Sequence, residues 1–279
     1  MTRRACVALL LLGCGASAPG AEASGMDASA AEPGAAPGRD LGGDAMADAG
    51  GDAGRDLGVE GPDAGADRCA RAGEGATCTL PAYPRRPYRV WVPSGPSDAL
   101  PVVLALHGGG GSAESTERTT CAGGDLRSPS CLHALGQREG FATVYPNGTE
   151  NTDEAGRFRV WNAGGSDPYM CVAGRACTEN VDDVAYLEAV LDALAAELPV
   201  DPARVYATGL SNGGAMAHRL ACELAERVVA IAPIGAGNQL ATSAPCTPAE
   251  PVAVMHVHGT ADPCWRYRGG PVGGCIGDP

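Results

Sequence analysis

A serine between two glycines is the first group in this chain that could do chemistry. Gly209-Leu-Ser-Asn-Gly213 matches the pattern G-x-S-x-G. It follows an apolar run typical of a strand and precedes a stretch typical of a helix. A sharp turn here would expose the Ser211 hydroxyl as a nucleophile and would direct the Asn212 N–H and the helix N-terminus at a developing oxyanion. The alternative is a glycine-rich loop that carries a surface serine.

A second oxyanion donor could come from the run His107-Gly-Gly-Gly-Gly111, which follows another apolar run. Glycine lets a backbone N–H approach a substrate carbonyl oxygen closely. We expect Gly109 to be this donor, with Gly108 or Gly110 as equal alternatives and a flexible turn as the non-catalytic interpretation. A dinucleotide loop is disfavoured because no G-x-G-x-x-G opens a helix with an acid about 20 residues later.

Asp262 follows the apolar run 252–258 and comes after the serine in the chain. That position satisfies the order serine, acid, histidine, in which the acid orients the histidine and stabilises the imidazolium. A solvated aspartate in a turn is the alternative. The expected histidine is missing, because none of the five histidines follows Asp262. His258 is the least unfavourable substitute base; the others are His107, His133, His218 and His256.

These groups need a sheet that brings several strand ends together. Apolar runs that predict strands alternate with amphipathic stretches that predict helices, which implies a mostly parallel α/β sheet with helices on both faces. Asp182 and Asp183 begin a helix that extends to Leu198, and another helix follows Gly209. The expected strands are 87–93 (edge or half-buried), 102–107 (central and buried), 141–145, 204–208, 228–234 and 252–257.

Six short motifs occur in chain order from about Arg86 to the C-terminus. They are His107-Gly-Gly-Gly-Gly111, Tyr145-Pro-Asn-Gly148, Trp161-Asn-Ala-Gly164, Val181-Asp-Asp-Val184, Gly209-Leu-Ser-Asn-Gly213 and His258-Gly-Thr-Ala-Asp262. Together they resemble the secreted esterase family that groups polyhydroxybutyrate depolymerases with feruloyl esterases. The resemblance implies an α/β-hydrolase fold, no metal or cofactor, and ester hydrolysis through an acyl-enzyme with Ser211 as nucleophile and Asp262 as acid.

The pattern of that family continues beyond the acid with a helix, a last strand and the loop that carries the histidine. We therefore expect the hydrolase domain to be truncated at its C-terminus and to lack its catalytic histidine. Without a base, Ser211 would stay protonated and weakly nucleophilic. These residues alone should then turn over ester poorly or not at all.

Three aromatic residues near the expected site, Trp161, Tyr169 and Trp265, could line an acyl or aryl pocket; ordinary packing is the alternative. The substrate is a small-molecule or polymeric ester, and the sequence leaves feruloyl, hydroxyalkanoate and acetyl esters open. A non-catalytic hydrolase-fold lipoprotein that binds a polyester or polysaccharide is the main rival. A serine peptidase is disfavoured because the chain leaves no room for a large gating domain.

Residues 1–14 form a signal peptide of the lipoprotein type, with a basic start, an apolar run and the lipobox-like Leu11-Leu-Gly-Cys14. Cleavage after Ala16-Ser-Ala18 is the alternative, and both export the protein. Residues 15–67 are rich in Ala, Gly and Asp and predict a disordered tether. The hydrolase domain takes 68–279. We expect a monomer outside the cell or on its surface, held to the membrane by a lipid anchor only.

The net charge is −13, and all 20 basic residues are Arg. The acidic balance disfavours nucleic acid as a partner, and the absence of Lys excludes a Walker A loop, a Schiff base and a Ser-Lys dyad. Twelve cysteines are present; those from Cys69 onward indicate a disulfide framework in an exported domain. The simplest pairing, which the sequence does not fix, is sequential: 69–78, 121–131, 171–177, 222–246 and 264–275.

Overall fold

The computed structural model describes residues 69–95, 98–151, 158–164, 174–240, 244–270 and 272. The expected signal peptide 1–14, the tether 15–67 and Tyr169 lie outside these residues. Within them, no helix combines the length and the apolar character needed to cross a bilayer.

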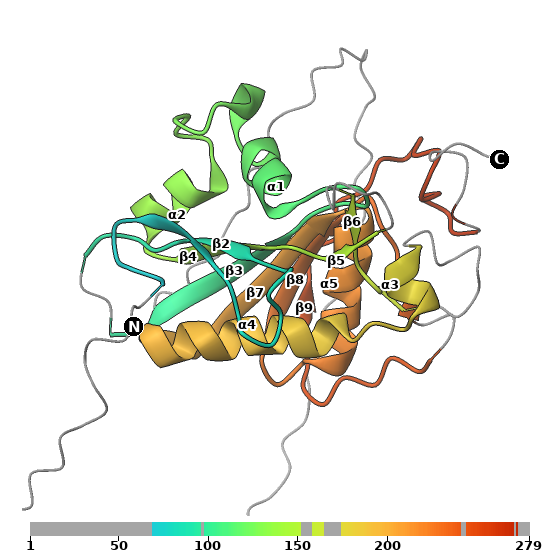
Figure 1. Cartoon of the computed structure of the whole chain (residues 1–279). Coiled ribbons are helices and arrows are strands. Elements are labelled where there is room, and N and C mark those ends of the chain that lie inside the picture. Colours follow the sequence, from blue (N-terminus) through green and yellow to red (C-terminus); the bar gives the residue numbers. More distant parts are fainter. Residues whose placement is uncertain are drawn as a thin grey trace, which may run out of the picture. The chain divides into compact units, whose positions relative to one another are not determined.

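A seven-stranded sheet has the order β1-β2-β4-β3-β7-β8-β9 (Figure 1). All neighbouring pairs from β4 to β9 are parallel, whereas β2 runs antiparallel to both β1 and β4. The strands are β1 Gly75–Cys78, β2 Tyr88–Trp91, β3 Leu100–Leu106, β4 Ala142–Pro146, β7 Val200–Leu210, β8 Ala230–Ile234 and β9 Ala253–Val254, and the separate hairpin is β5 Thr149–Glu150 with β6 Arg159–Val160. The mostly parallel sheet is confirmed. β2 is not an edge strand, because the unexpected β1 covers its outer side.

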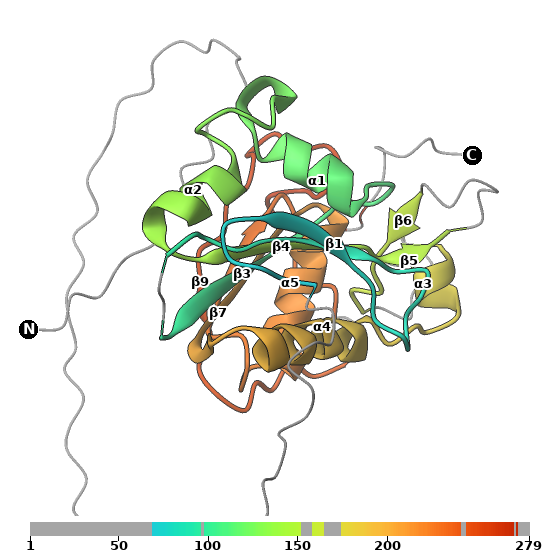
Figure 2. The ribbon, with the colours of Figure 1, turned by 60° about the vertical axis from the view of Figure 1, so that its left-hand side comes forward.

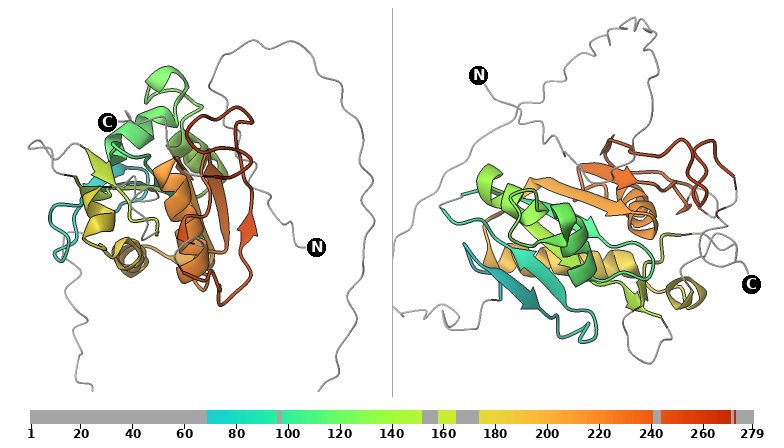
Figure 3. Two further views of the ribbon diagram at one scale, coloured as in Figure 1. Left: turned by 90° about the vertical axis from the view of Figure 1, so that its right-hand side faces the viewer. Right: turned by 90° about the horizontal axis from the view of Figure 1, so that it is seen from above.

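Helices cover both faces of this sheet. Figures 2 and 3 show α1 and α2 over one face, with α4 and α5 on the other. The helices are α1 Ala113–Thr119, α2 Leu132–Glu139, α3 Arg175–Thr178, α4 Asp183–Glu197 and α5 Asn212–Glu223, with a 3-10 turn at Ala122–Gly124. α4 begins as expected, because the Asp182 side chain accepts a hydrogen bond from the Ala185 N–H.

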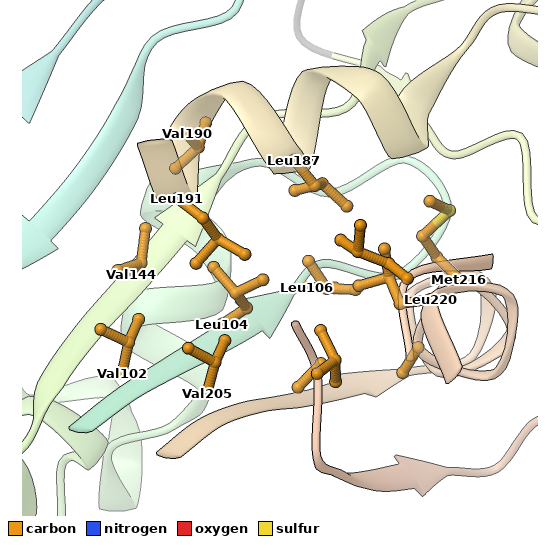
Figure 4. Packing of buried hydrophobic residues seen from close by; sticks show 14 of the residues in the cluster. Val102, Leu104, Leu106, Val144, Leu187, Val190, Leu191, Val205, Met216 and Leu220 are labelled. Atoms are coloured by element: carbon orange, nitrogen blue, oxygen red, sulfur yellow. The ribbon is translucent and has the colours of Figure 1, made fainter. Parts of the chain in front are cut away.

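The core follows the two-residue period of the central strand β3. Leu104 and Leu106 point to the side of α4 and α5, where they meet Leu187, Leu191 and Leu220 (Figure 4). The alternate residues of the same strand belong to a smaller cluster with α1 and α2. This central strand therefore has apolar cover on both faces and forms a rigid base for the loops at its carboxyl end.

Three disulfides join cysteines in the sequential order that the spacing suggested: Cys69–Cys78, Cys121–Cys131 and Cys222–Cys246. Cys177 and Cys264 are also disulfide-bonded. Their expected partners, Cys171 and Cys275, lie outside the described residues.

The outermost strand, β9, is much less covered than β3. It pairs with β8, and a single bridge joins Ile234 to Val257 beyond it. Val254, Met255 and Val257 remain 55%, 45% and 44% exposed. Because side chains alternate between the faces of a strand, exposure of consecutive residues means that both faces are open here.

Candidate active site

Ser211 lies at the sharp turn between β7 and α5. Its backbone has φ 53° and ψ −122°, and Ser211 and Asn180 are the two non-glycine residues with positive φ in the described part of the chain. Such a conformation is strained for an L-residue and is typical of functional sites. The Ser211 N–H donates to the Ile234 carbonyl at 2.9 Å, and the residue stays partly exposed, as an accessible nucleophile requires.

The two glycines around the serine are required by space. A Cβ on Gly209 would lie 2.5 Å from the Gly213 carbonyl. A Cβ on Gly213 would collide with the carbonyl oxygens of Leu106 and His107. These contacts are with backbone, which cannot move aside as a flexible side chain can. Both glycines are therefore sterically required by this turn.

The glycine run after β3 lies directly against this turn. A Cβ on Gly108 would be 3.7 Å from the Ser211 Cβ, and one on Gly109 would be 3.8 Å from the Asn212 Cβ. The Gly110 N–H donates to the Arg159 carbonyl at 2.8 Å. Gly110 is therefore not available as an oxyanion donor, which leaves Gly108 and the exposed Gly109.

The Asn212 side chain has a structural role. Its Oδ1 accepts from the Trp161 N–H at 2.7 Å, and its Nδ2 donates to the Trp161 carbonyl at 3.0 Å. Asn212 is the first residue of α5, and the first N–H groups of a helix have no acceptor within it. Because its side chain is engaged, the group of Asn212 that could act as the expected oxyanion donor is its backbone N–H, in the positive field of the helix start.

The expectation that Trp161 and Trp265 contact substrate is not supported by their burial. Trp161 is fully buried, and its indole Nε1 donates to the His107 carbonyl at 2.9 Å. Trp265 is 8% exposed, and it belongs to the loop that holds Asp262. Both rings pack the interior beside the site instead of lining an open surface.

Two apolar side chains that the sequence analysis did not select are exposed next to the site. Leu210 directly precedes Ser211 and is 54% exposed. Phe158 is 38% exposed, and its ring covers Gly110, where a Cβ would lie 2.6 Å from the ring. The pairing of Arg159 with Gly111 places Phe158 beside the glycine run 107–111, which we call the oxyanion loop. These two segments are far apart in sequence. No local sequence pattern predicts this contact of Phe158.

Asp262 lies at the same end of the sheet as Ser211. Its Oδ2 is 3.5 Å from where a Cβ on Gly235 would be, and Gly235 follows Ile234, the acceptor of the Ser211 N–H. The other oxygen, Oδ1, accepts from the N–H groups of Cys264 and Trp265 at 2.8 and 3.0 Å. Local hydrogen bonds thus fix one oxygen and leave the other for a partner.

His258 contacts this carboxylate but does not face the serine. Its Nε2 is 3.4 Å from the Asp262 Oδ2 and 2.5 Å from the Trp265 carbonyl, and its Nδ1 is 3.1 Å from the His256 Nε2. Both ring nitrogens are therefore engaged. Among the described residues, no hydrogen bond joins a histidine to the Ser211 hydroxyl.

Residues of the Y-P-N-G motif connect the segments around the site. Asn147 links distant segments, because its Oδ1 accepts from the Ala113 N–H at 2.8 Å and its Nδ2 donates to the Pro87 carbonyl at 2.7 Å. Gly148 is needed because a Cβ there would lie 2.5 Å from the Val160 carbonyl oxygen. Asn147 and Gly148 of the Y-P-N-G motif thus have structural roles.

The second aspartate of the V-D-D-V motif, Asp183, forms a buried ion pair. Asp183 is 2.5 Å from Arg86 and also accepts from the Asn162 N–H at 2.6 Å. Burial raises the pKa of Asp183, and the Arg86 charge opposes that rise. A buried pair of this kind fixes geometry more than it adds stability. It holds the segment of Asn162, and the adjacent Trp161 then holds Asn212.

A strained serine after a central parallel strand, a helix directly behind it and a glycine loop beside it together define an α/β-hydrolase fold. The strand order and the helices on both faces agree with this class.

Comparison with known proteins relates the chain to esterases. No protein-family model matches it. A protein of Nocardia uniformis subsp. tsuyamanensis with the name "Putative esterase NocK" is 33% identical over 187 residues. These residues are 66% of this chain and 47% of NocK. Feruloyl esterase B of Piromyces equi is 30% identical over 114 residues (40% and 19%). The bifunctional acetylxylan esterase/xylanase XynS20E of Neocallimastix patriciarum is 25% identical over 183 residues (66% and 22%).

This chain thus spans less than half the length of these curated relatives. Among solved structures, a thermostable esterase aligns over 70% of this chain and 48% of its own, with 19% identity and a TM-score of 0.43.

Proposed function

We propose that this protein is a serine esterase that hydrolyses carboxylic esters through an acyl-enzyme. The observation that carries the proposal is the backbone of Ser211, which holds positive φ at a strand–helix turn with the glycine loop against it. A strained serine persists only where the surrounding structure imposes it. The relatedness to proteins named as esterases supports the same conclusion.

In the proposed reaction, the Ser211 Oγ attacks the ester carbonyl carbon while a histidine removes its proton. The oxyanion of the tetrahedral intermediate accepts hydrogen bonds from the backbone N–H groups of Gly109 and Asn212. The histidine then protonates the leaving alcohol, and water releases the acid by the same route. Asp262 orients the histidine and stabilises its charged form.

The base is a histidine that none of the described residues holds against Ser211. His258 is the substitute within the chain, but both of its nitrogens have other partners. The described residues would then supply the nucleophile, the acid and the oxyanion donors.

The substrate we propose is an ester with an apolar or aryl acyl group, because Phe158 and Leu210 present apolar surface at the site. The names of the relatives favour feruloyl and acetylxylan esters, and a hydroxyalkanoate polyester is the further candidate. We also propose that the protein is exported, anchored through Cys14 as a lipoprotein and monomeric.

The test compares the 279-residue chain with a form that continues past residue 279, using p-nitrophenyl acetate, methyl ferulate and a hydroxybutyrate oligomer. The longer form should hydrolyse at least one ester. Ser211→Ala should abolish turnover, and the control Ser128→Ala, at a partly exposed position, should leave it unchanged. Substrate binding without turnover by the longer form would overturn the esterase proposal in favour of a non-catalytic binding protein.

A further inference from the structure

His107 is a buried polar side chain that the reaction above does not use. It is 2% exposed and directly precedes the glycine loop. Its Nε2 accepts from the Gly148 N–H at 2.8 Å, and its Nδ1 lies 2.8 Å from the Gly108 carbonyl oxygen. Two segments 41 residues apart are thus joined through one imidazole.

These two contacts fix the tautomer of the ring. A nitrogen that accepts from a backbone N–H carries no proton, so in the neutral ring the proton lies on Nδ1 and is donated to Gly108. Burial lowers the pKa of His107 the most, the Gly108 hydrogen bond opposes this and the nearby Arg159 and Arg86 charges add to it, so that the pKa is about 4. The ring is therefore neutral over the ordinary pH range.

The Gly108 carbonyl is held from two sides, by the His107 ring and by the Gly111 N–H at 2.9 Å. In a trans peptide the C=O and the following N–H point in opposite directions. The Gly108 oxygen faces the buried imidazole, so the Gly109 N–H faces the exposed side of the loop. The serine turn is close to this peptide, because a Cβ on Gly108 would lie 3.7 Å from the Ser211 Cβ and one on Gly109 would lie 3.8 Å from the Asn212 Cβ.

We propose that His107 is a positioning residue of the oxyanion hole, whose Nδ1–H fixes the Gly108–Gly109 peptide so that the Gly109 N–H faces the reacting carbonyl. This inference rests on the proposed esterase function. It also selects Gly109 over Gly108 as the donor. A loop of four glycines would otherwise sample many conformations, and preorganised donors are what make such a site effective.

The ring itself is held in place by its surroundings. The His107 and Trp161 rings lie 4.8 Å apart, and Trp161 also donates to the His107 carbonyl. A Cβ on Gly148 would come within 3.0 Å of the His107 Nε2. The glycine of the Y-P-N-G motif is therefore needed for the imidazole to reach the Gly148 N–H, which connects that motif to the oxyanion loop.

A matched pair of amide variants tests the proposal in the longer form of the protein. His107→Asn places an N–H near the Nδ1 position and so can still donate to Gly108, but it loses the bond from Gly148. His107→Gln places an oxygen near the Nε2 position and so keeps the Gly148 bond, but it loses the donor to Gly108. Each variant loses one buried hydrogen bond, so both should be destabilised to a similar degree.

We expect kcat to fall about 100-fold or more in His107→Gln, the size of effect seen when one oxyanion donor is lost, with KM changed little. His107→Asn should retain kcat within about tenfold because its donor keeps the loop in place. Equal losses of kcat in the two variants, or a better His107→Gln, would overturn the positioning role.

A second measurement does not depend on activity. Backbone ¹⁵N relaxation of Gly109 should show an ordered amide in the unmodified protein and in His107→Asn, and a mobile one in His107→Gln. If the unmodified longer form hydrolyses no ester, the proposed function fails, and the relaxation of Gly109 still decides whether His107 holds the loop. An equally ordered Gly109 in both variants would contradict the inference.

Discussion

The two sides of the site are built in different ways. On the oxyanion side, His107, Trp161 and Asn212 are buried and are connected by hydrogen bonds between segments distant in the sequence. On the acid side, Asp262 is held by N–H groups two and three residues away, beside a strand whose residue Val254 is 55% exposed.

The difference reflects what each group needs. A serine in a strained backbone conformation stays there only if packing and hydrogen bonds from several directions impose it. A carboxylate needs its oxygen oriented, which a local turn can do, because aspartate side chains readily accept from backbone N–H groups nearby. The oxyanion side should thus be sensitive to changes in the core, and the acid side to changes in its own chemistry.

The largest effect we expect is on the acid side and is chemical. Asp262→Asn keeps an Oδ1 that can accept from Cys264 and Trp265, so the loop should keep its fold. The amide cannot stabilise an imidazolium, and kcat of the longer form should fall by about 10⁴-fold. Steady-state kinetics and thermal unfolding check this together. Loss of activity matched by unfolding would show that Asp262 is structural instead.

The next largest effect we expect is on the oxyanion side, where a substitution should lower the free energy of unfolding. Asn212→Ala leaves the buried Trp161 N–H without an acceptor, at about 1–3 kcal/mol for an unsatisfied group, whereas the Trp161 carbonyl still accepts from the Ala163 N–H at 3.1 Å. Urea unfolding of the 279-residue chain should show a loss of about 1–3 kcal/mol. Asn212→Asp is the matched control, because it retains the acceptor for the Trp161 N–H and loses only the donor to the Trp161 carbonyl, so its loss of stability should be smaller.

Lowering the pH should also destabilise the folded chain through its buried histidines. Burial lowers the pKa of His107 to about 4 and that of His218 likewise, so between about pH 6.5 and 4 the unfolded chain binds protons that the folded chain does not. Stability therefore falls as the pH falls through this window. His107 accounts for up to about 3 kcal/mol at 1.36 kcal/mol for each pKa unit.

Urea unfolding at several pH values between 7 and 4 measures this slope. The slope should be shallower in His107→Asn, which has no titrating ring at that position. An identical pH dependence in that variant and in the unmodified chain would show that His107 titrates normally.

The smallest effect we expect is seen when the same substitution, Val to Thr, is made at a buried and at an exposed position. Val102 is fully buried in β3, and Val254 is 55% exposed in β9. Val102→Thr places a hydroxyl in the apolar core and should cost about 1–3 kcal/mol. Val254→Thr should change stability by less than about 0.5 kcal/mol, as most surface substitutions do. Similar losses at the two positions would mean that β9 is covered in solution.

Much of the fold was predictable because it is encoded locally. The apolar run that became β3, the Asp182 N-cap of α4 and the strand–serine–helix order around Ser211 depend on periodicity, capping and steric need over short stretches. β1 was missed because Gly75–Cys78 is short and has no clear alternation. The role of Trp161 stayed open because an aromatic residue near a site can equally line a pocket or fill the core, and only burial decides between them.

The sequence by itself determined where the strained serine turn forms, because two glycines in a strand–helix junction are the local steric solution to that turn. It also determined the chain order of serine and acid. Only the tertiary structure decided which groups meet across the sheet: that Arg159 occupies the Gly110 N–H, that Phe158 covers the oxyanion loop, and that His107 joins Gly148 to Gly108. Contacts between residues far apart in sequence depend on how strands and loops pack, and no local spacing encodes them.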